Sequence, residues 1–486
     1  MKQEEVKKPG HRGLLRTLGT GGLFSIGYAD VGAGIYLALG LVTIHAGYAT
    51  PIAIGIAAIA YILTGLSYAE LSAVYPTAGG SATYAQRAFG DPVSFVSGWM
   101  LCLDYVVTSA IFAIPAVAYL SYFDPALKQT FWLGTGAVLL LAGLLLLNVI
   151  GIKESVNFTL GLSLLDISSE IALVVLGLVL VVIPGGLLFK WPSTFTLGIH
   201  PTWSELIQGV TLAMVSYLGI EALAQAAEET KIAGRTIPRA TMLTLGTVVF
   251  LYLIISTVAV NIVNPNDLST IWKDDPLSGV AHALPGLAGV AMAPLVAILG
   301  CTISIIGANA GIIGSSRTLY AMSKYRLLPG RFGSIHSKFR TPHVAILTFG
   351  LVSISLVAVS SFGFLGGSVD PLLLLGSLYN VGALLAYVKA HASLIVTRNT
   401  DKERFRPFRV PLSIHIRDWE IPILPVLGML STGAIWVAVI VTHELGRLLG
   451  LVWVLTGMGL YIYFRRSSNL PVWKRAEVSN RRSVQD

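Results

Sequence analysis

Charged side chains are scarce in this chain. Asp, Glu, Lys and Arg make up 12% of its 486 residues, whereas soluble proteins carry about 25%. Hydrophobic residues make up 54%, and the mean hydropathy is +0.74. This composition excludes a water-soluble protein and a disordered one. The 50 glycines and 22 prolines are typical of bundled transmembrane helices, in which small residues allow close packing.

Cysteine is also rare, and metal-binding patterns are absent from the sequence. Cys102 and Cys301 both lie in apolar runs, so the sequence contains neither a disulfide framework nor a C-x-x-C site. The nine histidines occur singly, in loops or near the ends of apolar runs, and H-E-x-x-H does not occur. The serines of GGSATY and GSSR lack a nearby base. We therefore expect no enzyme activity, no metal site and no cofactor.

Long uncharged or nearly uncharged runs predict an all-α integral membrane protein with twelve transmembrane helices. A helix needs about 20 residues to cross about 30 Å of hydrocarbon. The charged N-terminal stretch lacks an A-x-A-like cleavage site, so we expect no signal peptide. The predicted spans are residues 17–44, 49–74, 93–121, 131–150, 155–183, 203–226, 240–263, 285–320, 342–361, 370–396, 421–442 and 446–464.

The basic residues predict the orientation of these spans. Short cytoplasmic loops collect Lys and Arg, and with the N-terminus inside, 29 of the 33 basic residues lie on one side. The other side has only Lys128, Lys190, Lys273 and Arg447. We therefore expect a multi-pass protein of the cell membrane with both termini in the cytoplasm. Because the net charge of +8 is a topology signal, it does not predict a nucleic-acid partner.

Two predicted spans are interrupted by glycine next to an acid. Span one contains Gly27, Gly32 and Gly34 around Asp30, and span six contains Gly219 near Glu221. Glycine is about 1 kcal/mol worse than alanine inside a helix, so these clusters favour local unwinding, although they also permit tight helix packing. Interrupted helices at corresponding places in two halves point to a central binding site between inverted repeats.

Spans one and six are five apart, as a repeat of five plus five helices requires. This repeat divides the chain into six parts. The parts are a cytoplasmic N-terminal tail (1–16), a first five-helix repeat (17–183), a second five-helix repeat (203–396), a cytoplasmic loop (397–420), two further helices (421–464) and a cytoplasmic basic tail (465–486).

Several motifs follow one another between about Gly13 and Pro411. They are VGAGIY at 31–36, YAELSAVYPTAGGSATYAQRAFG at 68–90, GIEALAQAAEETKIAGRTIPRA at 219–240, SSRTLYAMSKYRLLPGRF at 315–332, RTP at 340–342 and RPFRVP at 406–411. In their order and their topological positions, these motifs resemble the amino acid-polyamine-organocation (APC) superfamily of permeases.

This resemblance implies two inverted five-helix repeats plus two C-terminal helices, which cycle by alternating access. It also implies that backbone groups of spans one and six bind the two ends of an amino acid. Exposed N–H groups attract a carboxylate, and exposed carbonyls attract an ammonium group. The amides implied are those of Gly32, Ala33 and Gly34, and the carbonyls implied lie at Tyr217, Gly219 and Ile220. Alanine at position 33, in place of a hydroxyl residue, removes one side-chain donor.

Five acids lie within the predicted spans, whereas no Lys or Arg lies deep in any of them. A charge at the centre of a spanning helix costs about 2.5 to 3.5 kcal/mol on insertion scales, so these acids must face the bundle interior or a water-filled path. Without basic partners they require protons, metal cations or cationic substrate groups. The five are Asp30, Asp104, Asp166, Glu170 and Glu221.

Three of these acids lie on the spans expected to form the substrate site. Asp30 is two residues before Gly32 and either contacts the substrate or caps the second half of its helix. Glu221 matches the acid of the span-six motif and is a candidate for proton coupling or gating. Asp104 and Thr108 share one helical face, which either lines the site or makes an interhelical hydrogen bond.

Asp166 departs from the family pattern. It falls approximately where sodium-independent relatives carry a lysine that relays protons, so that role is not transferred to this chain. Either Asp166 takes up a proton or the site holds a cation. Glu170 is one helical turn further on the same face, and two interacting carboxylates titrate as a pair. The alternative is that both acids lie at the membrane interface.

The function expected is proton-coupled import of an amino acid or related organic amine. Protons are the expected coupling ion, and sodium or potassium is not excluded. The alternative is a potassium/proton symporter of the same superfamily, because the acids in spans one and three also resemble those of potassium transporters. A channel is less consistent with two interrupted helices. The expected partners are a small-molecule substrate and the lipid bilayer, and no sequence signal indicates an oligomeric state.

Overall fold

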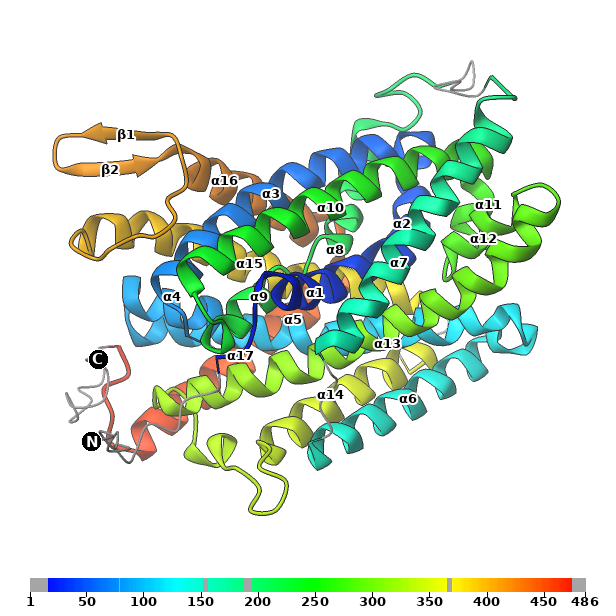
Figure 1. The fold of residues 1–486 in the computed structure, drawn as a ribbon. Coiled ribbons are helices and arrows are strands. Elements are labelled where there is room, and N and C mark those ends of the chain that lie inside the picture. Colours follow the sequence, from blue (N-terminus) through cyan, green and yellow to red (C-terminus); the bar gives the residue numbers. More distant parts are fainter. Residues whose placement is uncertain (1–15, 78, 152–155, 187–194, 365–368, 474–486) are drawn as a thin grey trace, which may run out of the picture.

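The protein is almost entirely helical. The computed structural model describes residues 16–77, 79–151, 156–186, 195–364 and 369–473 (Figure 1). The helices are α1 (Thr20–Val31), α2 (Ile35–Ala46), α3 (Thr50–Val74), α4 (Gly80–Phe89), α5 (Asp91–Ala118), α6 (Thr130–Ile150), α7 (Val156–Gly177), α8 (Trp203–Ser216), α9 (Glu221–Gln225), α10 (Ala233–Ile262), α11 (Pro265–Ser269), α12 (Pro276–His282), α13 (Leu287–Lys324), α14 (His343–Ser361), α15 (Pro371–Thr400), α16 (Ile423–Thr442) and α17 (Glu444–Ser467).

Within the described residues, eleven helical runs are long and apolar enough to cross a membrane. The first run, Thr20–Val74, has 55 residues, about 80 Å of helix at 1.5 Å per residue. Two spans are predicted within it, and α2 ends between them at Gly47, whose φ of 51° is in the left-handed range. The ten other runs each match one predicted span. The fold class is therefore confirmed, while the count of twelve crossings and the repeat stay predictions.

Capping residues start two of the helices, and charged residues carry others beyond the predicted spans. A capping box starts α8, in which Thr202 and Glu205 bond to each other's backbone N–H groups. Asp370 caps α15 by accepting from two N–H groups in its first turn. Hydropathy marks only the apolar part of a helix, so charged end segments such as residues 233–239 and 397–400 were missed.

Burial distinguishes central helices from peripheral ones. Every residue in the most apolar 18-residue stretch of α5 is buried, against 22% in α17. The exposed side chains of the peripheral helices are themselves large and apolar, for example Leu139, Val441 and Leu455. An exposed apolar surface of this kind suits lipid contact rather than water. The central helices therefore position the polar residues discussed below.

A two-stranded hairpin lies between α15 and α16. Strands β1 (Ser413–Ile416) and β2 (Trp419–Pro422) pair antiparallel, with His415 opposite Glu420. The hairpin lies at the opposite end of the molecule from α11 and α12 (Figure 1). It begins in the predicted cytoplasmic loop 397–420, and β2 continues two residues into the predicted span 421–442. Residues 1–15 of the predicted N-terminal tail and residues 474–486 of the basic tail lie outside the described residues.

Candidate functional site

The centre of the bundle brings together three of the predicted acids. Asp30 comes from α1, Asp104 from α5 and Glu221 from the first turn of α9. Each side chain is 0 or 1% exposed, and all three lie close enough for their carboxyl groups to interact electrostatically. The structure therefore assembles an acidic centre whose three carboxyl groups are buried from solvent.

The chain is non-helical between α8 and α9, as predicted for span six. Gly219 has a φ of 117°, which side chains rarely tolerate. A Cβ atom at this position would lie 2.9 Å from Cγ of Asp30. Glycine is thus required twice here, for the backbone turn and for the close approach of the Asp30 carboxyl group. The break in span six and the acid of span one form one unit.

Tyr387 on α15 holds this break in place. Its hydroxyl group donates to Oε2 of Glu221 at 2.6 Å and accepts from the backbone N–H of Gly219 at 3.1 Å. All three groups are buried, and buried polar groups are costly when they lack a partner. Tyr387 was not predicted as a site residue, because it is 166 positions from Glu221 and its helix contains no interruption.

The carboxyl groups of Asp104 and Glu221 are close enough to interact electrostatically. No donor in the described part of the chain reaches either carboxylate oxygen of Asp104. Two carboxylates share a hydrogen bond only if one carries a proton, so this pair is suited to hold a proton or a cationic group. The Thr108 hydroxyl instead donates to the backbone carbonyl of Asp104 at 2.9 Å, within its own helix.

Span one differs from the prediction. Gly32, Ala33 and Gly34 form a 3₁₀ turn with helical dihedral angles, and the Gly32 N–H donates to the Tyr28 carbonyl. This turn replaces the unwound segment. A Cβ atom at Gly34 would lie 2.3 Å from the carbonyl oxygen of Ser216. Gly34 thus permits tight packing of span one against span six, and Gly32 leaves room for the Tyr28 ring of its own span; close packing is the alternative interpretation of such clusters.

The carbonyl groups predicted in span six are partly engaged. Those of Gly219 and Ile220 accept the N–H groups of Ala222 and Leu223 at 3.0 and 3.3 Å, and each retains a second lone pair.

The Tyr217 ring stacks on a neighbouring tyrosine ring, with 4.9 Å between centroids. Its hydroxyl group has no hydrogen-bond partner among the described residues. These two stacked tyrosine rings lie beside the acidic centre.

Asp166 and Glu170 form a second acidic cluster, against the opposite side of span one. The Tyr36 hydroxyl donates to Oδ1 of Asp166 at 2.6 Å, and the Tyr28 hydroxyl lies 2.9 Å from Oδ2 of Asp166 and 3.3 Å from Oε2 of Glu170. Both acids are 1% exposed and so are buried within the helical bundle. A tyrosine has one hydroxyl hydrogen, so Tyr28 serves only one of the two carboxyl groups at a time.

None of the five acids forms an ion pair with a Lys or Arg in the described segments. The same segments contain no group of three or more His, Cys, Asp or Glu side chains arranged to hold a metal ion. Charges that are buried without a partner are costly. The acidic centre therefore requires protons or an incoming cation for neutralisation.

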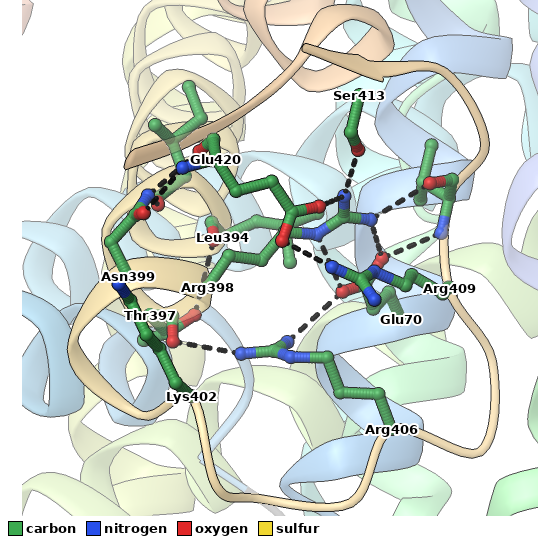
Figure 2. Close-up of polar contacts among 12 residues, drawn as sticks. Glu70, Leu394, Thr397, Arg398, Asn399, Lys402, Arg406, Arg409, Ser413 and Glu420 are labelled. Carbon is green, nitrogen blue, oxygen red and sulfur yellow. Dashed lines mark hydrogen bonds and ion pairs between the residues drawn. The ribbon is translucent and has the colours of Figure 1, made fainter. Parts of the chain in front are cut away.

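A separate network of buried ion pairs joins the ends of α3 and α15 to the hairpin (Figure 2). Arg398 and Glu70 are both 0% exposed and are paired, with Nε of Arg398 2.9 Å from Oε1 of Glu70. Arg406 also binds Glu70, at 3.0 Å. Nη1 of Arg398 also binds Oε1 of Glu420, at 2.7 Å. Arg398 lies just beyond the predicted tenth span, so the sequence did not indicate a buried cation here.

The network also fixes the loop before the hairpin. The Val410 N–H donates to Oε2 of Glu70 at 2.7 Å, and Arg409 pairs with Glu420. Burial opposes ionisation of Glu420, but Ser413, Arg398 and Arg409 together hold its pKa below the ordinary value. Two motifs noted in the sequence, YAELS and RPFRVP, are thus in direct contact, although they are more than 300 residues apart.

The comparisons with known proteins agree with this architecture. The sequence profile of the amino acid permease family matches residues 18–460. The branched-chain amino acid permease BcaP of Bacillus subtilis is 27% identical over 484 residues, which cover 95% of this chain and 96% of the relative.

Two further relatives match over most of their length. The low-affinity putrescine importer PlaP of Escherichia coli is 28% identical over 88% of this chain and 89% of its own. The methylthioribose transporter of Bacillus subtilis is 28% identical over 88% and 92%. The family match covers nearly the whole helical bundle, including both acidic clusters. This chain therefore belongs to the amino acid permease family of the APC superfamily and is a multi-pass membrane transporter.

Proposed function

We propose that the protein imports an amino acid or related organic amine, that it is coupled to protons, and that it works by alternating access. The observation that carries this proposal is the acidic centre of Asp30, Asp104 and Glu221, buried beside the break in span six with no basic partner among the described residues. A protonated amine supplies the positive charge that these carboxyl groups lack.

The ammonium end of such a substrate has more support than its carboxylate end. Asp30 has one carboxylate oxygen without a partner in the described part of the chain, and Asp104 has two. The Gly32 amide that a substrate carboxylate would bind is occupied by the Tyr28 carbonyl. Carboxylate binding therefore requires opening of this turn. The relatives are named for an amino acid, a diamine and a thiosugar, so family membership alone does not choose among these substrates.

Proton coupling is supported by the second cluster. Asp166 and Glu170 are bound through Tyr28 and Tyr36 to the helices on either side of the 3₁₀ turn in span one. A proton gained or lost by this pair changes which carboxyl group accepts the Tyr28 hydroxyl hydrogen, and so changes the constraint on span one. We also place the protein in the cell membrane with cytoplasmic termini, from the distribution of basic residues.

Uptake into proteoliposomes tests this function. With the outside more acidic, labelled leucine or putrescine is expected to accumulate, and collapse of the gradient with a protonophore is expected to abolish accumulation. Liposomes without protein are the control. Accumulation of labelled rubidium without any amino acid or amine would replace this proposal by potassium/proton symport. Uptake that is unaffected by both the pH gradient and the protonophore would contradict the proton coupling but not the transport of an amino acid or amine.

Tyr387→Phe tests the assignment of the break in span six. The substitution leaves Oε2 of Glu221 and the N–H of Gly219 without their shared partner, and a hydrogen bond to a charged group contributes about 1.5 to 3 kcal/mol. We therefore expect substrate affinity to fall about tenfold to a hundredfold. Tyr463→Phe, at an exposed position on α17, is the matched control. Equal effects of the two substitutions would show that Tyr387 has no special role.

A further inference from the structure

A groove opens where the predicted cytoplasmic ends of α1 and α10 meet the loop before the hairpin. Its volume is about 660 Å³, and its lining includes Thr20 at the start of α1, Arg235 and Arg239 on α10, and Phe408 from the loop. The acidic centre contributes no residue to this lining. The groove is therefore separate from the site described above.

On the α10 wall of the groove, basic residues come first along the helix and apolar residues follow. Arg235, Arg239, Met242 and Leu243 follow the spacing i, i+4, i+7 and i+8 and so share one face of the helix. Both arginines are exposed, and in the described part of the chain neither guanidinium group has an ion-pair partner. Leu243 is 53% exposed and lies about 12 Å further along the helix axis than Arg235.

The opposite wall is held in a fixed position. Pro407 packs so closely on α10 that a Cβ atom at Gly234 would lie 2.6 Å from it. On either side of Pro407 and Phe408, Arg406 and Arg409 are bound to the buried network of Figure 2. The groove is therefore formed before any ligand arrives, which reduces the entropy lost on binding.

We propose that this groove binds an anionic phospholipid. The paired guanidinium groups bind the phosphate, since arginine forms charge-assisted hydrogen bonds with phosphate oxygens. The acyl chains follow Met242 and Leu243 into the hydrocarbon region, and Phe408 covers the glycerol end. Basic pockets between transmembrane helices at the cytoplasmic surface suit such lipids. A free phosphate ion would leave the apolar half of the groove unused.

Bound lipid would contact two helices and the fixed loop at the same time. Thr20 is the first residue of α1, Arg235 and Arg239 lie on α10, and Phe408 belongs to the loop held by Glu70. The lipid therefore stabilises one relative position of spans one and seven. Its presence is expected to change the rate of transport as well as the stability of the protein.

The test uses the purified full-length protein in detergent with three probes: dioctanoyl phosphatidylglycerol, dioctanoyl phosphatidylcholine and inorganic phosphate. Native mass spectrometry counts bound lipid, and thermal shift gives the apparent Kd. Phosphatidylglycerol is expected to bind, and the double variant Arg235→Gln with Arg239→Gln is expected to raise its apparent Kd about 30-fold. Arg331→Gln with Lys338→Gln removes the same charge from exposed positions on another loop and should change it less than threefold.

Four results would overturn the proposal. Equal binding of phosphatidylcholine would make the groove a general apolar surface, and equal protection by inorganic phosphate would make it a simple anion site. An equal loss in the control variant would show non-specific attraction to basic loops. Lipid that binds only after deletion of residues 1–15 would identify that segment of the chain as the occupant.

Discussion

Glu70→Gln is expected to lower the free energy of unfolding by about 3 to 5 kcal/mol, because removing one partner of a buried ion pair leaves the remaining charges uncompensated. The network contains three arginines and two glutamates, so loss of Glu70 leaves Arg398, Arg406 and Arg409 with a single acid. Loss of Arg398 instead leaves two cations with two acids. Glu70→Gln should therefore be more damaging than Arg398→Met.

Unfolding titrations in mixed micelles of dodecyl maltoside and dodecyl sulfate measure these differences. Arg409→Gln is the matched control, since its side chain is 55% exposed and exposed ion pairs contribute only about 0 to 1 kcal/mol. The double variant Glu70→Gln with Arg398→Met should lose less stability than the sum of the single losses, because the two groups interact directly. Strictly additive losses would contradict the role given to this pair.

Asp30→Asn is expected to reduce substrate binding by at least about a hundredfold and to abolish uptake. The substitution keeps the size of the side chain that packs on Gly219 but removes the charge that attracts an ammonium group in a site closed to water, where electrostatic attraction is strongest. Ligand-induced thermal stabilisation reports binding, and proteoliposome uptake reports transport.

The control for Asp30 is Asp124→Asn, the same chemical change at an exposed position. Asp124 caps a 3₁₀ turn through its side chain, and asparagine caps equally well, so this variant should behave like the wild type. Transport by Asp30→Asn at near wild-type levels would reject the assignment of Asp30 to the substrate site.

Much of the fold followed from local sequence features. Long apolar runs predicted the spans because the hydrocarbon core has a fixed thickness. The break in span six was predicted correctly, since Gly219 adopts a backbone conformation that few other residues tolerate. The same reasoning predicted an unwound span one, where Gly32 and Gly34 instead allow close packing. Glycine content alone does not distinguish these two uses.

The acids of the site could also be named from the sequence, because charge within an apolar run is expensive. The sequence could not show which of these acids lie together in the folded protein. Asp30, Asp104 and Glu221 form one centre, while Asp166 and Glu170 form another. Helical periodicity orients each acid relative to its own helix only. Which faces meet depends on the packing of helices far apart in the chain.

The sequence by itself therefore determined the helical membrane-protein class, the long apolar helices and the acids that must avoid lipid, since each depends on local hydrophobicity and charge. Only the tertiary structure decided their partners. Tyr387 reaches Glu221 across 166 positions, and Arg406 reaches Glu70 across 336. Tyrosine and arginine fit many environments, so their roles depend on which distant backbone the folded bundle places beside them.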